Sequence, residues 1–223
     1  NKQQVYSSFE LPVFSNDRST RKFLPGTEWL YYKIYCGSKT ADEILSQCIQ
    51  PVTEKLLQLK LIDKWFFIRY NDPDFHLRLR IHICKAGTMG QVMEIFLNYI
   101  KQMDEEGFIT KLQTDTYLRE MERYGSTLME QAEQLFFIDS TIKLEFLQLT
   151  EGDEREKFRW LWGLRGVDEL LTAFGYSLTN KYELMHSLKE AFSKEINADK
   201  AMFRQLNQQY NDNRQLIHGV MEV

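Results

Sequence analysis

The chain has 223 residues, of which 43% are hydrophobic and 13% aromatic, so it can bury the core of one large domain or two small ones. Its formal net charge of −4 argues against a general binder of nucleic-acid backbones, and we expect no direct contact with nucleic acid. Its three cysteines are widely spaced and include no CxxC pair, so they support neither a disulfide framework nor a metal site.

Two further features concern the compartment. No apolar run approaches the ~18 residues that a membrane span requires. The polar start "NKQQVYSSFELP" lacks the basic and then apolar regions of a secretion signal. Together with the cysteine pattern, these features predict a cytoplasmic protein without a membrane span.

The first elements can be taken in chain order. Residues 1–27, rich in Ser, Asn, Arg and Pro, are expected to form an N-terminal arm or linker. The aromatic and β-branched run "WLYYKIYC" (29–36) predicts a strand. A helix is predicted to begin at Thr40, with Glu43 at capping-box spacing, and Pro51 should kink or restart it.

The next three elements include a hairpin. The stretch "WFFIRYNDPDFHLRLRIHIC" (65–84) divides at "NDPDF" into two strands, which predicts a loop of about five residues. "GQVMEIFLNYIKQMDEEG" (90–107) predicts a helix that ends at Gly107. "FITKLQTDTYLREMERYG" (108–125) mixes β-branched and aromatic residues and predicts another strand, which finishes before Gly125.

The remainder of the chain has helical periodicity, in segments 126–150, 154–174, 179–196 and 199–222, separated by "EGDE", "GYS" and "NADK". We therefore predict an α+β fold. Its N-terminal half should form a mostly antiparallel sheet packed with helices, and its C-terminal half should be all helical. Residues 28–223 are expected to form a single domain.

Side chains alternate along an extended strand, so the second strand of the hairpin should have two unlike faces. Leu77, Leu79, Ile81 and Ile83 share one face, and His76, Arg78, Arg80, His82 and Cys84 share the other. The aliphatic face is expected to pack against helices. Two arginines at successive positions of one face repel each other unless acidic groups or a bound anion lie between them. The alternative is an exposed face with solvated cations.

A second charged cluster, in "DTYLREMERYG", contains Asp115, Arg119, Glu120, Glu122 and Arg123. If this segment pairs beside the hairpin, Arg119 or Arg123 adds to the cations there and Glu120 orients the guanidiniums. Otherwise the cluster is an ordinary ladder of charges. A pocket with several arginines selects an acidic planar group. A carboxylate suits it better than a phosphate, because the chain has no Gly-rich loop.

Four blocks of the sequence, taken in order, resemble the C-terminal elimination domain of LanB-type lantibiotic dehydratases, also called the thiopeptide-type bacteriocin biosynthesis domain. They are "FLPGTEWLYYKIYCG", "WFFIRYNDPDFHLRLRI", "DTYLREMERYG" and "MEQAEQLFFIDS". The motifs cover residues 21–140, and the helical remainder matches more weakly. The resemblance implies a lyase. A companion domain esterifies Ser or Thr of a precursor peptide with glutamate from glutamyl-tRNA, and the elimination domain expels the glutamate to leave dehydroalanine or dehydrobutyrine.

The resemblance also implies the site residues. Arg78 and Arg80 match the "RLR" pair of the family and Glu120 and Arg123 its "RExxRY" motif, so these four are the expected catalytic residues. Arg80 and Arg123 should bind the carboxylates of the glutamyl group, with Arg78 and Glu120 building the pocket. Substrate-binding roles are expected for His76, Arg69, Tyr117 and Arg119, and His76 should hold the hairpin turn through Asp72 or Asp74. A general base must reach the α-carbon. No cofactor is expected, because the activating glutamate is delivered covalently.

The end of the chain departs from the family pattern. Members typically carry a histidine in an "HMxxNR"-like block, to which a part in proton transfer is attributed. This sequence ends in "RQLIHGVMEV", where His218 has the right residue type in a different context. Either the C-terminal end is truncated or the protein lacks this histidine.

Other functions stay open at this point. Related stand-alone enzymes join two dehydroalanines in a formal cycloaddition that forms a pyridine, and others append amino acids to peptides from aminoacyl-tRNA. The arginine and glutamate set favours elimination, because an eliminase must hold glutamate. A non-catalytic module that binds the precursor peptide is the third reading. The expected partners are the glutamylated precursor peptide and a glutamylating domain or protein that uses glutamyl-tRNA, and a homodimer stays open.

Overall fold

The computed structural model describes residues 20–222, so most of the arm or linker predicted over 1–27 lies outside the described residues. The chain divides into two compact units, of which the first ends at Leu149 and the second begins at Thr150. Each unit is described by itself. The prediction of one domain over 28–223 stays a prediction, because this division does not decide whether the two units act together.

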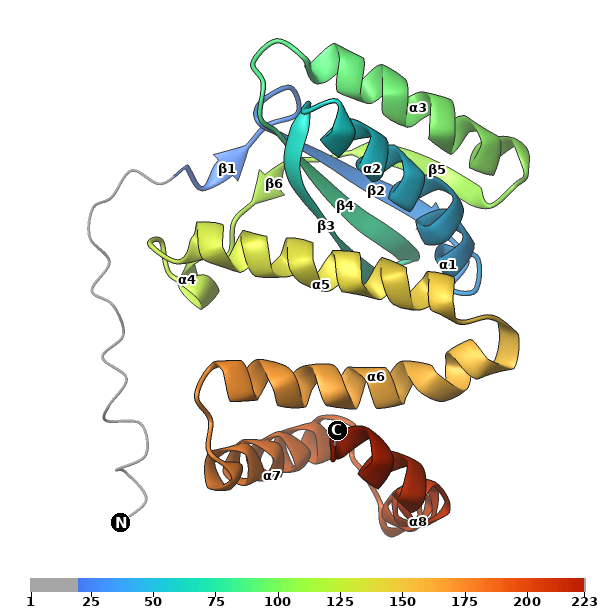
Figure 1. Ribbon diagram of the computed structural model, residues 1–223, viewed down its shortest axis with the longest axis vertical. Coiled ribbons are helices and arrows are strands. Elements are labelled where there is room, and N and C mark those ends of the chain that lie inside the picture. Colours follow the sequence, from blue (N-terminus) through green and yellow to red (C-terminus); the bar gives the residue numbers. More distant parts are fainter. Residues whose placement is uncertain (1–19, 223) are drawn as a thin grey trace. The chain divides into compact units, whose positions relative to one another are not determined.

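The first unit combines strands and helices, and the second contains helices (Figure 1). The strands are β1 (Lys22–Phe23), β2 (Trp29–Cys36), β3 (Ile62–Asn71), β4 (Phe75–Ile83), β5 (Ile109–Thr114) and β6 (Tyr117–Leu118). The helical segments of the first unit are α1 (Ala41–Ile44), the π-helical η1 (Leu45–Ile49), α2 (Gln50–Gln58), α3 (Met89–Glu105), α4 (Met121–Tyr124) and α5 (Met129–Leu149). The second unit contains α6 (Gly152–Ala173), α7 (Leu178–Glu195) and α8 (Lys200–Met221). The predicted α+β class is confirmed.

Four strands form an antiparallel sheet in the order β3-β4-β2-β5, and β1 pairs with β6 in a separate two-stranded ribbon. The predicted hairpin is β3 and β4. Its loop is shorter than expected, because the strand pairing continues to Asn71 and Phe75. The outer edge of β3 is covered by α5, where the hydroxyl of Ser140 accepts a hydrogen bond from the N–H of Phe67 at 3.1 Å. This contact satisfies a backbone group that an edge strand would otherwise leave unpaired.

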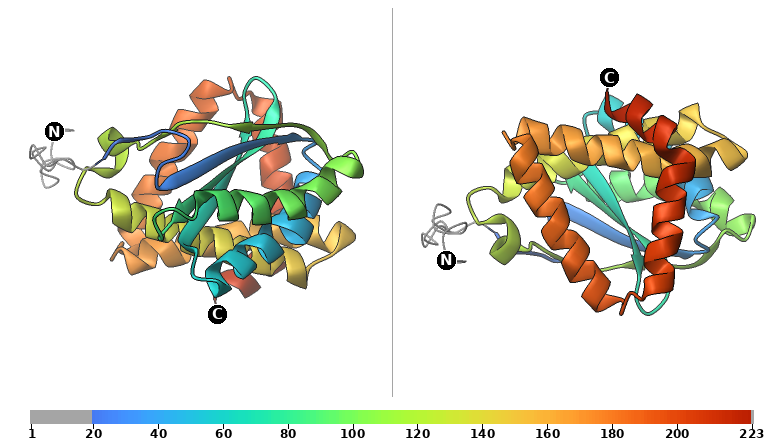
Figure 2. Two further views of the ribbon diagram at one scale, coloured as in Figure 1. Left: turned by 90° about the horizontal axis from the view of Figure 1, so that it is seen from above. Right: turned by 90° about the horizontal axis from the view of Figure 1, so that it is seen from below.

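The aliphatic face of β4 forms the core, as its alternation predicted. Leu77, Leu79 and Ile81 have no exposed surface and share one cluster with apolar residues of α2, α3 and α5. Helices α2 and α3 lie side by side over this face of the sheet (Figures 1 and 2). The opposite face of β4 therefore carries its polar side chains.

The helix after β2 begins differently from the prediction. Thr40 precedes α1, but its hydroxyl donates to the carbonyl of Gly37 at 3.0 Å and caps no helical N–H. The predicted capping box is therefore wrong, and the carboxylate of Glu43 instead accepts from the side chain of Gln47 at 2.8 Å. Pro51 restarts the helix as predicted. The wide π-helical turn of η1 comes just before Pro51, and Pro51 lies in the first turn of α2, where a residue without an N–H group is accommodated.

The strand predicted over 108–125 is only partly correct. Strand β5 ends before Asp115, whose carboxylate accepts from the N–H of Thr116 at 2.7 Å and turns the chain. Strand β6 then covers two residues and pairs with β1, and α4 follows. The charged cluster over 115–125 therefore does not pair with the hairpin, which was the condition for Arg119 or Arg123 to join its cations.

The second unit consists of the helices predicted over 154–174, 179–196 and 199–222, shown in the right view of Figure 2, whereas the helix predicted over 126–150 is α5 of the first unit. Ser177 begins α7 with a capping box, and the carboxylate of Asp199 caps α8. The side chain of Arg165 donates to the carbonyl of Val220 at 3.3 Å, so the end of α8 lies against α6. Within the described residues, no helix combines the length and the apolar character that a membrane crossing needs.

The cysteines provide a test of the packing. Burial raises the pKa of the Cys36 thiol to about 11 and that of Cys48 to about 12, whereas Cys84 is exposed. Because the thiolate is the reactive form, the native chain should react quickly with one equivalent of a maleimide at about pH 8, and the unfolded chain with three. Mass spectrometry counts the adducts. Cys84→Ser should remove the fast reaction, and fast labelling of Cys36 or Cys48 in the native chain would contradict the packing.

Candidate active site

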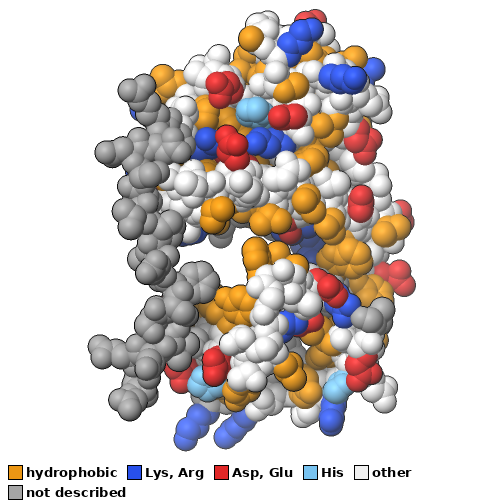
Figure 3. All heavy atoms as spheres, turned by 60° about the vertical axis from the view of Figure 1, so that its left-hand side comes forward, with side chains coloured by type: hydrophobic (Ala, Val, Ile, Leu, Met, Phe, Trp, Pro, Cys, Tyr) orange, Lys and Arg blue, Asp and Glu red, His pale blue; other side chains and the backbone are white. Residues whose placement is uncertain are grey.

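The face of the sheet opposite the core carries cationic and aromatic side chains, and we call it the cationic face. Residues paired directly across neighbouring strands point to the same side, so the register fixes its members. They are Lys64, Phe66, Ile68 and Tyr70 of β3, His76, Arg78, Arg80 and His82 of β4, Trp29, Tyr31, Lys33 and Tyr35 of β2, and Lys111 and Gln113 of β5. In Figure 3, basic, acidic and histidine side chains gather among hydrophobic ones in the upper part of the view.

Arg80 lies on this face and is almost fully buried, at 8% exposure, so it is not a solvated surface cation. Its guanidinium carbon lies 4.5 Å from the ring centre of Tyr31, 5.2 Å from that of Phe66 and 5.0 Å from that of Tyr117. Among the described residues, nothing accepts a hydrogen bond from its buried Nε and Nη1 atoms. Burial lowers the pKa of Arg80, although nearby tyrosines and the carboxylate of Glu120 oppose this effect. A buried cation with unused donors is typical of a site that binds an anion.

Arg78, the next side chain on this face of β4, is held by two neighbours. Its guanidinium carbon lies 3.3 Å from the ring centre of Tyr70, and its Nε donates to Nε2 of His76 at 3.1 Å. His76, at 1% exposure, places its Nδ1 2.8 Å from the carbonyl oxygen of Asp74. A carbonyl only accepts, so these partners assign a neutral His76 with its proton on Nδ1. His76 therefore links Arg78 to the hairpin turn.

An acidic group, Asp115, lies near Arg78. Lys33, which is paired with Arg78 across the sheet, forms an ion pair with Asp115. The hydrogen bond from Lys33 to Asp115 raises the pKa of the lysine. The positive charge of Arg78 also acts on Asp115 and favours its ionised form. This part of the face is therefore partly neutralised, whereas the guanidinium of Arg80 faces aromatic rings.

Glu133 of α5 has no exposed surface and joins three side chains. Its carboxylate accepts from Nε and Nη2 of Arg119 at 2.7 Å each and from the hydroxyl of Tyr117 at 3.0 Å, and Nζ of Lys64 lies 3.4 Å away. Burial alone would lower the pKa of Arg119, but the bonds to Glu133 outweigh it and raise the pKa. Arg119 is thus occupied by Glu133. Glu133 also holds the hydroxyl of Tyr117, and the ring of Tyr117 contacts Arg80 of the cationic face.

Glu120, Arg123 and Arg69 do not belong to the cationic face, although the charge of Glu120 acts on Arg80. Arg123 lies in the exposed turn of α4 and pairs at 2.9 Å, at the i, i+3 spacing of a helix, with Glu120, the residue that precedes this turn. Arg69 lies on the core side of β3, where it forms an ion pair with Asp42 of α1. Arg123 is therefore exposed rather than enclosed beside the β4 arginines, and Arg69 lies on the other side of the sheet.

Sequence reasoning missed Glu133, although a signal for it was present. The buried residues of α5 include Met129, Glu133, Ser140, Leu144 and Leu147, which recur at helical spacing. A carboxylate on such a buried stripe requires a partner, because an unpaired buried charge is very costly. The spacing could therefore have shown that Glu133 binds a cation, but not which one.

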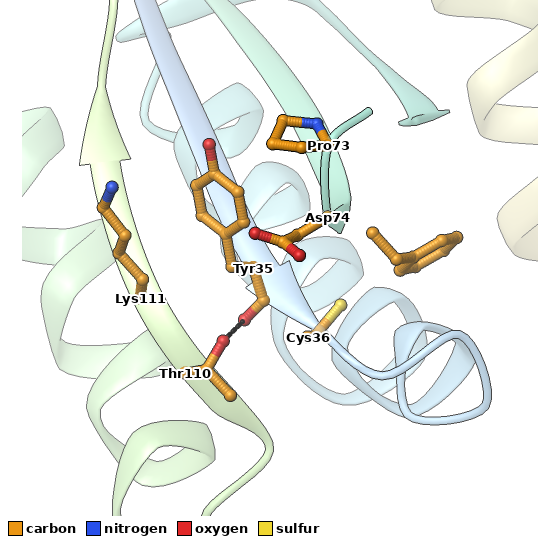
Figure 4. A pocket seen from close by; sticks show the side chains of 7 residues that line it. Tyr35, Cys36, Pro73, Asp74, Thr110 and Lys111 are labelled. Atoms are coloured by element: carbon orange, nitrogen blue, oxygen red, sulfur yellow. Dashed lines mark hydrogen bonds between the residues drawn. The ribbon is translucent and has the colours of Figure 1, made fainter. Parts of the chain in front are cut away.

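A pocket of about 490 Å³ lies near the hairpin turn (Figure 4). It is lined by Tyr35, Cys36, Pro73, Asp74, Phe75, Thr110 and Lys111. The hydroxyl of Thr110 donates to the carbonyl of Tyr35 at 3.3 Å, shown by the dashed line. The ring of Tyr35 lies 4.7 Å from that of His76, so the pocket adjoins the cationic face. Within residues 20–222, no group of three or more His, Cys, Asp or Glu side chains is arranged to hold a metal ion.

The sequence matches the family model described as Lantibiotic biosynthesis dehydratase C-term over residues 29–222. The chain belongs to this family. It is 27% identical over 208 residues to Subtilin biosynthesis protein SpaB of Bacillus subtilis, a match that covers 91% of the chain and 20% of that protein. It is 32% identical over 137 residues to Nisin biosynthesis protein NisB of Lactococcus lactis subsp. lactis, which covers 61% of the chain and 13% of that protein.

Two solved structures resemble this lantibiotic dehydratase C-terminal chain. The tRNA dependent lantibiotic dehydratase MibB from Microbispora sp. 107891 has a TM-score of 0.53 at 25% identity, covering 58% of this chain and 13% of MibB. TsrL has a TM-score of 0.63 at 18% identity, covering 87% of this chain and 59% of TsrL, and this likeness shows the fold alone. The chain spans about a fifth or less of the length of SpaB and NisB. Its family places it in lantibiotic biosynthesis, among dehydratase domains.

Proposed function

We propose that the chain eliminates glutamate from glutamylated Ser or Thr residues of a precursor peptide and leaves dehydroalanine or dehydrobutyrine. The observation that carries the proposal is the guanidinium of Arg80, which is buried and has two donors without an acceptor among the described residues. Guanidinium and carboxylate groups match in shape and form paired, charge-assisted hydrogen bonds. A glutamyl group brings one carboxylate with it and releases a second when its ester breaks.

The reaction develops negative charge at two places. Removal of the α-proton beside an amide carbonyl gives an enolate-like species, and breaking of the ester gives a carboxylate. Fixed cations stabilise both charges, and the effect is larger where aromatic rings exclude water, as they do around Arg80. The reaction as written needs no organic cofactor, since the activating glutamate arrives on the substrate.

The other residues take supporting roles in the proposal. Arg78 lies next to Arg80 and is oriented by His76, and Tyr117 forms part of the aromatic wall. Glu120 acts electrostatically on Arg80, which supports a part for α4 at the edge of the site. Arg123 of the same turn would bind the second carboxylate. Arg69 has no part in the proposal, because it lies on the core side of the sheet.

The neighbouring pocket offers room for residues that flank the modified one. It presents the cation of Lys111 and the carboxylate of Asp74 beside the aromatic ring of Tyr35 (Figure 4). Such a mixed lining suits a peptide, whose backbone and side chains supply both donors and acceptors. The partners in this proposal are a precursor peptide and a cytoplasmic glutamylating domain or protein that uses glutamyl-tRNA. The description of MibB as tRNA dependent supports the latter.

Incubation of the chain with a glutamylated precursor peptide tests the proposal. We expect each glutamylated residue to lose the mass of glutamic acid, and free glutamate to appear in equal amount, as measured by mass spectrometry and an enzymatic glutamate assay. The same peptide without glutamate should stay unchanged. Binding of the peptide without any change in mass would instead indicate a non-catalytic module, and would overturn the proposal.

A further inference from the structure

We propose that His82 and Asp63 form a proton-transfer pair beside Arg80, in which the imidazole of His82 removes the α-proton of the glutamylated residue. The inference rests on the proposed function and adds the general base that an elimination requires. It is based on a β-bulge, a short hydrogen bond and the place of His82 on the cationic face.

Asp63 is the extra residue of a β-bulge in β3. Ile62 pairs with Ile83 of β4. The preceding residue of β4, His82, pairs with Lys64, so Asp63 is left over and faces His82 as well. Bulges redirect side chains and are frequent next to active sites. Here the bulge brings Oδ1 of Asp63 to 2.6 Å from Nδ1 of His82.

This bond decides which nitrogen of His82 can act as a base. The carboxylate of Asp63 accepts, so Nδ1 of the neutral imidazole carries the proton and Nε2 keeps its lone pair. Across residues 20–222, no side chain or backbone group donates a hydrogen bond to Nε2 of His82. The His82 side chain is 21% exposed, so a substrate can reach it. A carboxylate that orients an imidazole in this way also stabilises the imidazolium that forms when it takes a proton.

His82 lies at a suitable distance from Arg80. The two residues share one face of β4 and are two positions apart, which corresponds to roughly 6.6 Å along a strand. Aromatic rings connect them, since Trp29 lies 4.9 Å from the His82 ring and 5.7 Å from Phe66, and Phe66 lies 5.2 Å from the Arg80 guanidinium. In a glutamylated serine, several bonds separate the α-hydrogen from the carboxylates of the glutamyl group. One ligand can therefore reach both side chains.

A purely structural role explains the pair less well. Strands β3 and β4 are already joined by backbone pairing on both sides of the bulge, so the contact is not needed to hold them together. The bulge itself interrupts the ladder. The other charged group opposite His82 is Lys64, which is engaged with Glu133 of α5. The imidazole is therefore left with one carboxylate partner and one free nitrogen.

In the proposed step, Nε2 of His82 takes the α-proton, and the electrons of that C–H bond pass through the enolate-like species into the double bond between the α- and β-carbons. The bond between the β-carbon and the ester oxygen breaks, and glutamate leaves as a carboxylate next to Arg80. The imidazolium of His82, paired with Asp63, then returns its proton to water.

The test compares the wild-type chain with His82→Ala, Asp63→Asn and the control His186→Ala, which removes an exposed histidine that faces Glu190 in the second unit. On a glutamylated peptide, His82→Ala should eliminate glutamate about 10²- to 10⁴-fold more slowly than wild type. Added imidazole should restore part of this rate, because it supplies the missing base. Asp63→Asn should also be slower, and His186→Ala should match wild type.

The outcomes distinguish this inference from the proposed function. If the wild-type chain eliminates glutamate and His82→Ala does so at the same rate, the inference is overturned while the proposed function stands. A loss of rate that imidazole leaves unrelieved would show a structural role for His82 and would overturn the inference too. A wild-type chain that releases no glutamate would overturn both.

Discussion

Arg80→Met is expected to slow glutamate elimination by about 10²- to 10³-fold, the usual effect of removing one preorganised group that stabilises developing charge. Glutamylated peptide should accumulate, as followed by mass spectrometry. The reason is that Arg80 is a cation enclosed by aromatic rings, which no neutral side chain of similar length can replace. Methionine keeps most of the volume and the apolar contacts of the arginine stem.

The same variant should fold at least as well as wild type. Two buried donors without an acceptor cost about 1–3 kcal/mol each, whereas stacking of a cation on aromatic rings contributes about 0.5–2 kcal/mol. Arg80→Met removes both effects, so we expect the free energy of unfolding in urea to stay equal or to rise. Loss of activity together with unchanged or higher stability is typical of a residue kept for function.

The control is Lys101→Met, which removes a positive charge from a side chain that is 74% exposed on α3. It should eliminate glutamate at the wild-type rate and unfold at the same urea concentration. If Arg80→Met were as active as wild type, Arg80 would not be the anion site. If it were active but much less stable, its role would be structural.

Glu133→Ala is expected to lower the free energy of unfolding by about 3–5 kcal/mol, because it leaves buried cations without their counter-charge. Arg119 is 6% exposed, and the Lys64 side chain is 14% exposed, so water cannot replace the carboxylate well. The hydroxyl of Tyr117 loses its acceptor as well. Urea unfolding followed by tryptophan fluorescence or circular dichroism measures the difference.

Glu145→Ala is the matched control, since it removes an exposed carboxylate from the same helix. It should change the free energy of unfolding by no more than about 0.5 kcal/mol. Glu133→Gln keeps an acceptor but loses the charge, so its loss of unfolding free energy should lie between those of Glu145→Ala and Glu133→Ala. If Glu133→Ala lowered the free energy of unfolding by less than about 1 kcal/mol, the buried contacts of Glu133 with Arg119 and Lys64 would be contradicted, because breaking a buried ion pair is strongly destabilising.

Local patterns predicted those parts of the molecule that depend on local geometry. The alternation in "HLRLRIHI" placed the aliphatic residues of β4 in the core and its arginines on the other face. The helices of the second unit followed from apolar spacing and from their breaks. The strand predicted over 108–125 was partly wrong, because an Asp115 turn and a helical Glu120–Arg123 pair are signals that β-branched composition obscures.

The sequence by itself determined the fold class, the hairpin and the family, and it placed Arg78 and Arg80 together on one face. It could not decide whether that face is exposed, because burial depends on which distant segments cover it. Only the tertiary structure decided that aromatic rings from three strands enclose Arg80, that Glu133 occupies Arg119, and that a bulge brings Asp63 to His82. Side-chain direction follows from neighbouring backbone geometry, whereas desolvation and ion pairing arise between residues that only folding brings into contact.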